Sequence, residues 1–105
     1  MKKISDSIDK LVKAVADTAH PIRIIMFGSA AHDKHGSAND IDLLVIMPNG
    51  IHRRKTAQEI YRKVRDVGMP YDIVVATLDD IERYRNAPGL IYHAALSDGR
   101  EVYAR

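Results

Sequence analysis

Four residues of this chain have types and spacings that could serve phosphate and metal chemistry. Gly28 and Ser29 directly follow one apolar run, and Asp40 and Asp42 open a second. Side chains alternate along a strand, so two aspartates one residue apart face the same side and can converge on one hard cation. Glycine lets backbone N–H groups approach an anion closely, and a helix starting here would add partial positive charge. The pattern indicates a triphosphate cradle beside a Mg²⁺ site.

Each half of this pattern also has an ordinary structural explanation. A Gly-Ser pair alone is commonly a turn, and two aspartates can lie at an exposed strand edge or cap a helix. The combination is more specific, because ionised carboxylates at the head of an apolar strand are costly to bury unless they are paired or bind a metal.

Asp72 is a third candidate ligand, because it opens another apolar run in the same way. Its alternative is an acid at a strand end in solvent. With all three aspartates the site could hold two Mg²⁺ ions, one on the triphosphate and one lowering the pKa of an acceptor hydroxyl. Asp40 and Asp42 would bridge both ions. Asp72 would hold the catalytic ion or act as the base.

The remaining polar residues leave several alternatives open. Ser29 would hydrogen-bond a phosphate oxygen, cap a helix, or do both. His32 could reach the triphosphate or lie in a solvated loop with Lys34 and His35. The histidines show no i,i+4 pair and there is no cysteine, which argues against zinc.

A group of basic residues is interpreted as a solvated helix face in preference to a surface that contacts nucleic acid or an acidic partner. These basic residues are His52, Arg53, Arg54, Lys55, Arg62, Lys63 and Arg65. Acidic residues at a predicted helix start are explained by the helix dipole; they are Asp79, Asp80 and Glu82.

The elements that must position these residues alternate in an α/β order. Apolar spacing predicts helices over residues 5–18, 29–34, 78–85 and 88–96, and a long helix that contains Ala57, Ile60, Tyr61, Val64 and Val67. Continuous apolar runs predict strands over residues 22–27, 40–47, 71–77 and 101–104.

Length and composition agree with one α/β (α+β) domain over residues 1–105, a small mixed sheet packed against helices. A chain of 105 residues that is 46% hydrophobic has room for one core. The absence of cysteine suits a reducing compartment, and we expect a cytoplasmic protein because neither a signal peptide nor a membrane span is apparent. The formal charge of +2 says little about partners.

These motifs resemble the minimal nucleotidyltransferases of the DNA polymerase β superfamily, whose hallmark is Gly-Ser followed by Asp-x-Asp. The resemblance covers nearly the whole chain. Three segments resemble the phosphate loop, the metal strand and the strand with the third carboxylate; they are Phe27-Gly28-Ser29-Ala30-Ala31, Asn39-Asp40-Ile41-Asp42-Leu43 and Tyr71-Asp72-Ile73-Val74-Val75. The tail Ala94-Ala95-Leu96-x-x-Gly99-x-x-x-Tyr103 resembles the closing helix and strand.

The resemblance implies an Mg²⁺-dependent nucleotidyltransferase palm domain that moves AMP from ATP to a hydroxyl group. The implied catalytic and metal residues are Asp40, Asp42 and Asp72, and the implied nucleotide-binding residues are Gly28, Ser29 and His32. The implied acceptor is a tyrosine on a small helical toxin of the HEPN type encoded nearby, which the chain neutralises as an antitoxin. Ala30 and His32 stand where the family often has arginines, and Asp33 replaces a common glycine. A binding module that neutralises its partner sterically is therefore one alternative, and an enzyme acting on a small molecule is another.

Overall fold

The apolar runs of the sequence form the strands of one sheet, and the amphipathic segments form helices on its two faces. The computed structural model describes residues 4–32 and 39–105. The helices are α1 (Ile4–Ala19), the 3₁₀ helix η1 (Ser29–His32), α2 (Arg53–Lys63), α3 (Leu78–Tyr84) and α4 (Ile91–Asp98), and the strands are β1 (Arg23–Phe27), β2 (Ile41–Met47), β3 (Tyr71–Thr77) and β4 (Arg100–Ala104). Within these ranges no helix is long and apolar enough to cross a membrane. The predicted α/β class is confirmed.

The sheet is mixed and has the strand order β3-β2-β1-β4. β1 pairs antiparallel with both β2 and β4, whereas β2 and β3 are parallel and are connected through α2. Parallel neighbours need such a crossover, because a hairpin joins only antiparallel strands. The register places Phe27 opposite Asp42, and Asp42 opposite Asp72. Two of the predicted carboxylates are therefore neighbours on adjacent strands.

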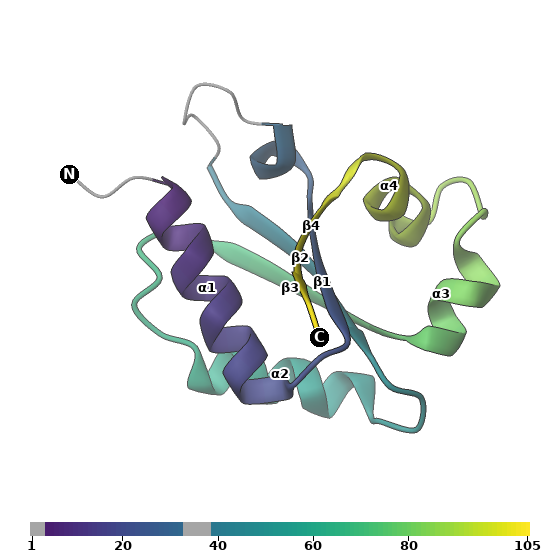
Figure 1. Ribbon diagram of the computed structural model, residues 1–105, viewed down its shortest axis with the longest axis horizontal. Coiled ribbons are helices and arrows are strands. Elements are labelled where there is room, and N and C mark those ends of the chain that lie inside the picture. The colour runs from purple at the N-terminus through teal and green to yellow at the C-terminus, as the bar shows by residue number, and fades with distance from the viewer. Residues whose placement is uncertain (1–3, 33–38) are drawn as a thin grey trace.

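Helices cover both faces of the sheet. In Figure 1, α1 and α2 lie on one side of it, and α3 and α4 lie on the other. The larger hydrophobic cluster lies on the α1 and α2 side and includes Leu11, Val15, Leu43, Val45 and Ile60. The smaller cluster lies on the α3 and α4 side and consists of Ile25, Leu44, Ile46, Ala76, Ile81 and Ala95. Because β2 is buried on both faces, its sequence is an almost continuous apolar run.

α2 ends earlier than the apolar spacing predicts. The spacing extends the helix to Val67, but it ends at Lys63, and Val64 has an extended backbone with φ −84° and ψ 124°. Asp66 has a φ of 59°, outside the range of an α-helix. Both Val64 and Val67 are nevertheless buried in the larger cluster. The prediction was wrong here because a turn buries these side chains as well as a helix would.

α4 also differs from its prediction. The spacing starts this helix at Pro88, but it starts at Ile91, after Leu90, whose backbone is extended. Ile91, the first residue of the helix, is 42% exposed. The short helix buries only Ala95 completely, and Leu96 packs partly buried against the smaller cluster.

Thr77 and Asp80 form a capping box at the start of α3. The Thr77 side chain accepts a hydrogen bond from the Asp80 backbone N–H, and the Asp80 carboxylate accepts one from the Thr77 backbone N–H. Arg53 pairs with the same carboxylate at 3.2 Å. Together these contacts lower the pKa of Asp80, although partial burial opposes them. The prediction that the acidic residues of this segment serve the start of a helix is therefore confirmed. Asp80 contributes a cap in addition to the favourable interaction with the helix dipole.

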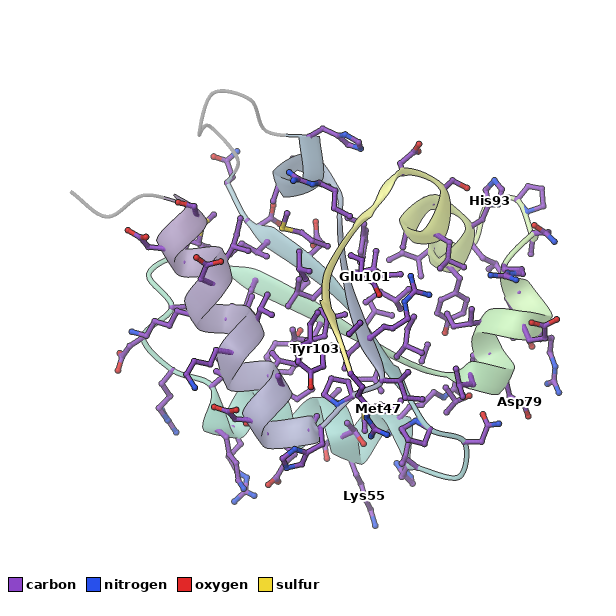
Figure 2. The ribbon with its side chains drawn as sticks, in the orientation of Figure 1. Met47, Lys55, Asp79, His93, Glu101 and Tyr103 are labelled. Atoms are coloured by element: carbon purple, nitrogen blue, oxygen red, sulfur yellow. The ribbon has the colours of Figure 1, made fainter. Side chains whose placement is uncertain are left out.

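β4 closes the sheet beside β1 with an irregular register. Ile24 pairs with Tyr103 and Ile25 with Glu101, so Val102 is the extra residue of a bulge. Both Val102 and Tyr103 can therefore pack against the larger cluster. Figure 2 shows Tyr103 directed toward α1 and Glu101 on the other side of the strand. Glu101 accepts a hydrogen bond of 2.8 Å from Arg23, which ties β4 to β1.

We predict that truncating either face of β2 destabilises the fold to a similar degree. Leu43→Ala and Leu44→Ala should each lower the free energy of unfolding by about 2–5 kcal/mol, because both side chains are fully buried in different clusters. Leu78→Ala, at a side chain that is 46% exposed, should change it by less than about 0.5 kcal/mol. Urea denaturation followed by circular dichroism measures all three. A loss in only one of the two β2 variants would mean that one face of the strand is open to solvent.

Candidate metal and nucleotide site

Three carboxylates meet at the end of the sheet where β2 and β3 begin. Asp42 and Asp72 are the second residues of these parallel strands and are paired in register, so their side chains point to the same face. Asp40 lies two residues before Asp42 and just outside the strand. One carboxylate oxygen from each residue lies within 4.8 Å of the others. The fold thus brings together all three aspartates that the sequence singled out.

The three carboxylates of this cluster carry like charges that repel one another when ionised. Asp40 and Asp42 are partly buried and Asp72 is exposed. Burial raises the pKa of Asp42, and the neighbouring charges of Asp40 and Asp72 raise it further. None of the ion pairs found among the described residues involves these three carboxylates. A bound cation would remove the repulsion that the fold creates.

The donor set suits a hard divalent cation such as Mg²⁺. Carboxylate oxygens are the ligands that such ions prefer, and this site offers oxygen only. Over residues 4–32 and 39–105, no other group of acidic or histidine side chains converges in this way, so no zinc-like cluster forms there. His35 lies outside the described residues.

Gly28 brings the turn after β1 against the carboxylates. Its φ of 73° is in the left-handed region, which favours glycine. A Cβ atom at this position would overlap the Asp42 carboxylate, so only glycine allows this close approach. The backbone N–H of Ala31 donates to the Gly28 carbonyl at 3.2 Å and closes the turn. The glycine turn and the carboxylate cluster therefore share one space.

The helix expected after this turn is only a short 3₁₀ helix. η1 spans four residues, and Ser29 at its start is exposed. A single turn aligns few peptide dipoles, so its contribution to anion binding is backbone N–H groups more than a helix dipole. The expectation of a helix over residues 29–34 holds as far as His32, and residues 33 and 34 lie outside the described part of the chain.

His32 is exposed at the end of η1 and lines a cavity next to the turn. Lys34, like His35, falls outside the residues that the structure describes. The cavity is also lined by Phe27, which belongs to the segment that resembles a phosphate loop, and by Ile91, Ala94 and Asp98 of α4. The sequence patterns did not indicate that these residues line one cavity, because they are far apart in the chain and only the fold brings them together.

Several basic residues of the α2 region have local partners. Arg62 and Lys63 both pair with Glu59, and this lowers the pKa of that carboxyl. Arg53 pairs with Asp80 of α3. His52 is not helical but caps α2, accepting a hydrogen bond from the Lys55 backbone N–H at 3.2 Å. These local pairs agree with a solvated helix face.

Comparisons with known proteins agree with the geometry. No curated protein matches the sequence significantly. A proposed nucleotidyltransferase from Sulfolobus solfataricus, solved as a crystal structure at 1.40 Å resolution, is similar in fold, with a TM-score of 0.60 and 19% identity over 97% of this chain and 86% of that one. The family model of the nucleotidyltransferase domain matches residues 8–98, a stretch that contains the glycine turn and all three carboxylates. The chain therefore belongs to the nucleotidyltransferase domain family.

Proposed function

We propose that the protein transfers AMP from ATP to a hydroxyl group of an acceptor and releases pyrophosphate, in a reaction that depends on Mg²⁺. The observation that carries this proposal is the convergence of Asp40, Asp42 and Asp72 within 4.8 Å, directly beside the Gly28 turn. A triphosphate binds well where backbone N–H groups of a glycine turn and a carboxylate-held cation are available together.

In this reaction the acceptor hydroxyl oxygen attacks the α-phosphorus of the nucleotide. The bond from that phosphorus to the bridging oxygen breaks, and pyrophosphate leaves with the bonding electrons. Asp72 takes the hydroxyl proton, because it is the exposed carboxylate of the cluster and is open to an incoming acceptor. Gly28 and Ser29 position the phosphates through backbone and hydroxyl hydrogen bonds.

The carboxylates would hold the metal. Asp40 and Asp42 would share two ions, with Asp72 completing the ligand set of one of them. Mg²⁺ bound there would neutralise phosphate charge and lower the pKa of the acceptor hydroxyl.

The acceptor that we propose is a tyrosine hydroxyl on a small helical protein of the HEPN type, which the transfer inactivates. In the described ranges all helices pack on one sheet, so an acceptor must approach the carboxylates from outside the domain. The specific partner class is supported by the motif resemblance.

The test is AMP transfer to the co-expressed product of a neighbouring gene, with Mg²⁺ and ATP, read by intact-mass spectrometry. We expect Asp42→Asn to reduce transfer by more than about 100-fold, because a direct ligand should matter more than the outer-shell partners of metal sites. Asp79→Asn is the matched control, since Asp79 is an exposed aspartate beyond the other end of β3. It should transfer at the wild-type rate.

Each other outcome selects a different function. Transfer retained by Asp42→Asn would show that the carboxylate cluster is not the catalytic site. A partner without added AMP that Asp42→Asn neutralises as well as wild type would indicate a steric binding module. AMP found on a small hydroxylated molecule in place of the protein would indicate a small-molecule nucleotidyltransferase.

We predict that the raised pKa of Asp42 makes the metal-free wild type lose stability relative to the Asp42→Asn variant as pH rises past about 3.8, the ordinary pKa of aspartate. Below this window Asp42 is protonated in both folded and unfolded states, whereas above it the folded state carries the cost of a partly buried charge and of its repulsion by Asp40 and Asp72. Asp42→Asn should therefore melt at a higher temperature than wild type at neutral pH but not at low pH. Added Mg²⁺ should raise the melting temperature of wild type more than that of the variant. Calorimetry with and without Mg²⁺ measures this. Parallel melting curves at every pH would contradict it.

Substitutions at two glycines separate backbone strain from loss of the site. Gly28 and Gly50 have φ values of 73° and 93°, but a Cβ atom overlaps Asp42 only at Gly28 and meets nothing within 4 Å at Gly50. Both alanine variants should lose about 1 kcal/mol of stability or more, because alanine disfavours positive φ. Only Gly28→Ala should weaken Mg²⁺-ATP binding, by about tenfold or more, as measured by titration calorimetry. Equal affinities in the two variants would place the triphosphate elsewhere.

A further inference from the structure

A cavity of about 330 Å³ lies between the turn after β1 and α4. Its lining residues are Phe27, Gly28, His32, Ile91, Ala94 and Asp98. Phe27, Ile91 and Ala94 give it apolar walls, while the other side chains offer an imidazole and a carboxylate. This volume falls at the lower end of the range of about 300–1,000 Å³ that is typical of small-molecule sites.

The cavity lies next to the carboxylate cluster, because Gly28 borders both. Gly28 lines the cavity and also lies against the Asp42 carboxylate, while Phe27, the other β1 contribution, is opposite Asp42 in the sheet. A nucleotide whose phosphates lie at Gly28 therefore has this cavity as the neighbouring space for its sugar and base.

The wall formed by α4 is held firmly in place. A Cβ atom at Gly99 would lie only 2.6 Å from the Ile25 side chain and 3.0 Å from the Met26 carbonyl oxygen, so the residue that follows α4 sits directly on β1. Ala95 is fully buried, which fixes the helix against the smaller cluster. The cavity is thus preformed, and binding there need not order a loop.

Ile91 is the feature of this wall that packing within the domain does not explain. It is 42% exposed, although a large apolar side chain gains most when it is buried. Its place on the rim of the cavity would allow it to cover one face of a flat ring, with the Phe27 side chain also in contact. Such apolar and aromatic contact is how proteins hold nucleobases without base pairing.

A larger cavity of about 450 Å³ lies elsewhere, between α1 and β4. Its lining includes Val12, Lys13, Val102 and Tyr103, which belong to the α1 side of the sheet. The carboxylates point to the other face, the one that carries Leu44 and Ile46. Proximity to the chemistry therefore favours the smaller cavity.

We infer that the cavity beside α4 binds the nucleoside part of the nucleotide, an inference that rests on the proposed function of the carboxylate cluster. Ile91 and Phe27 contact the base, and Asp98 accepts hydrogen bonds from hydroxyl or amino groups of the nucleoside. α4 is then the element that makes the protein prefer a nucleotide to a bare polyphosphate.

The test compares two ligands, ATP and inorganic tripolyphosphate, each titrated with Mg²⁺ into the full chain in a calorimeter. Ile91→Gln should weaken ATP binding by about tenfold and leave tripolyphosphate affinity within about twofold, because only ATP carries a group that reaches the cavity. Leu90→Gln is the matched control: Leu90 is 43% exposed and adjacent in sequence but does not line the cavity. It should leave both affinities unchanged.

A second variant fills the cavity without removing a contact. Ala94 is exposed on α4 and lines the cavity, and Ala94→Leu keeps good helix propensity. It should also weaken ATP binding selectively. Wild-type ATP affinity in both Ile91→Gln and Ala94→Leu would overturn the inference while leaving the proposed function intact. Equal weakening of both ligands by either variant would also overturn it. A wild-type protein that binds neither ligand would contradict the proposed function itself, and the inference with it.

Discussion

The parallel, in-register pairing of β2 with β3 is the constraint on which the site depends. It places Asp42 opposite Asp72, and two carboxylates held side by side repel each other. A shift of one residue would turn Asp72 and its neighbours to the other face, and that shift is resisted because alternate residues of β3 contact different clusters. Apolar packing on both faces of the sheet thus keeps like charges close together despite their repulsion. Such an arrangement is common in binding sites that are already formed before the ligand binds.

The sequence predicted most elements and all three carboxylates because these depend on local pattern. β2 is recognisable from its uninterrupted apolar run, α1 from its periodic apolar face, and the aspartates from their position at strand starts. The end of α2 was predicted wrongly because helical spacing of apolar residues does not require a helix. Val64 and Val67 are buried at helical spacing in an extended and turning segment.

What the sequence could not show is which distant residues become neighbours. Gly28 and Asp42 approach because β1 and β2 pair antiparallel with Phe27 opposite Asp42. Likewise, the cavity beside α4 exists because Gly99 lets the end of that helix lie on β1. Neither contact is encoded by spacing along the chain. The convergence of the three carboxylates could thus be expected from their positions at strand starts, but the space beside them required the fold.

The placement of β4 next to β1 has a consequence for how the chain acquires its structure. The pairing joins the first strand of the sheet to the last one, across nearly the whole sequence. Closing so long a loop costs more conformational entropy than closing a hairpin, and contacts this distant in sequence slow folding. During synthesis β1, β2 and β3 emerge first, with all three carboxylates, while α4 and β4 follow. Until then one edge of β1 is unpaired, and the face that carries Leu44 and Ile46 is incompletely covered. The nascent chain therefore passes through a stage in which an unpaired strand edge and apolar side chains are open to aggregation.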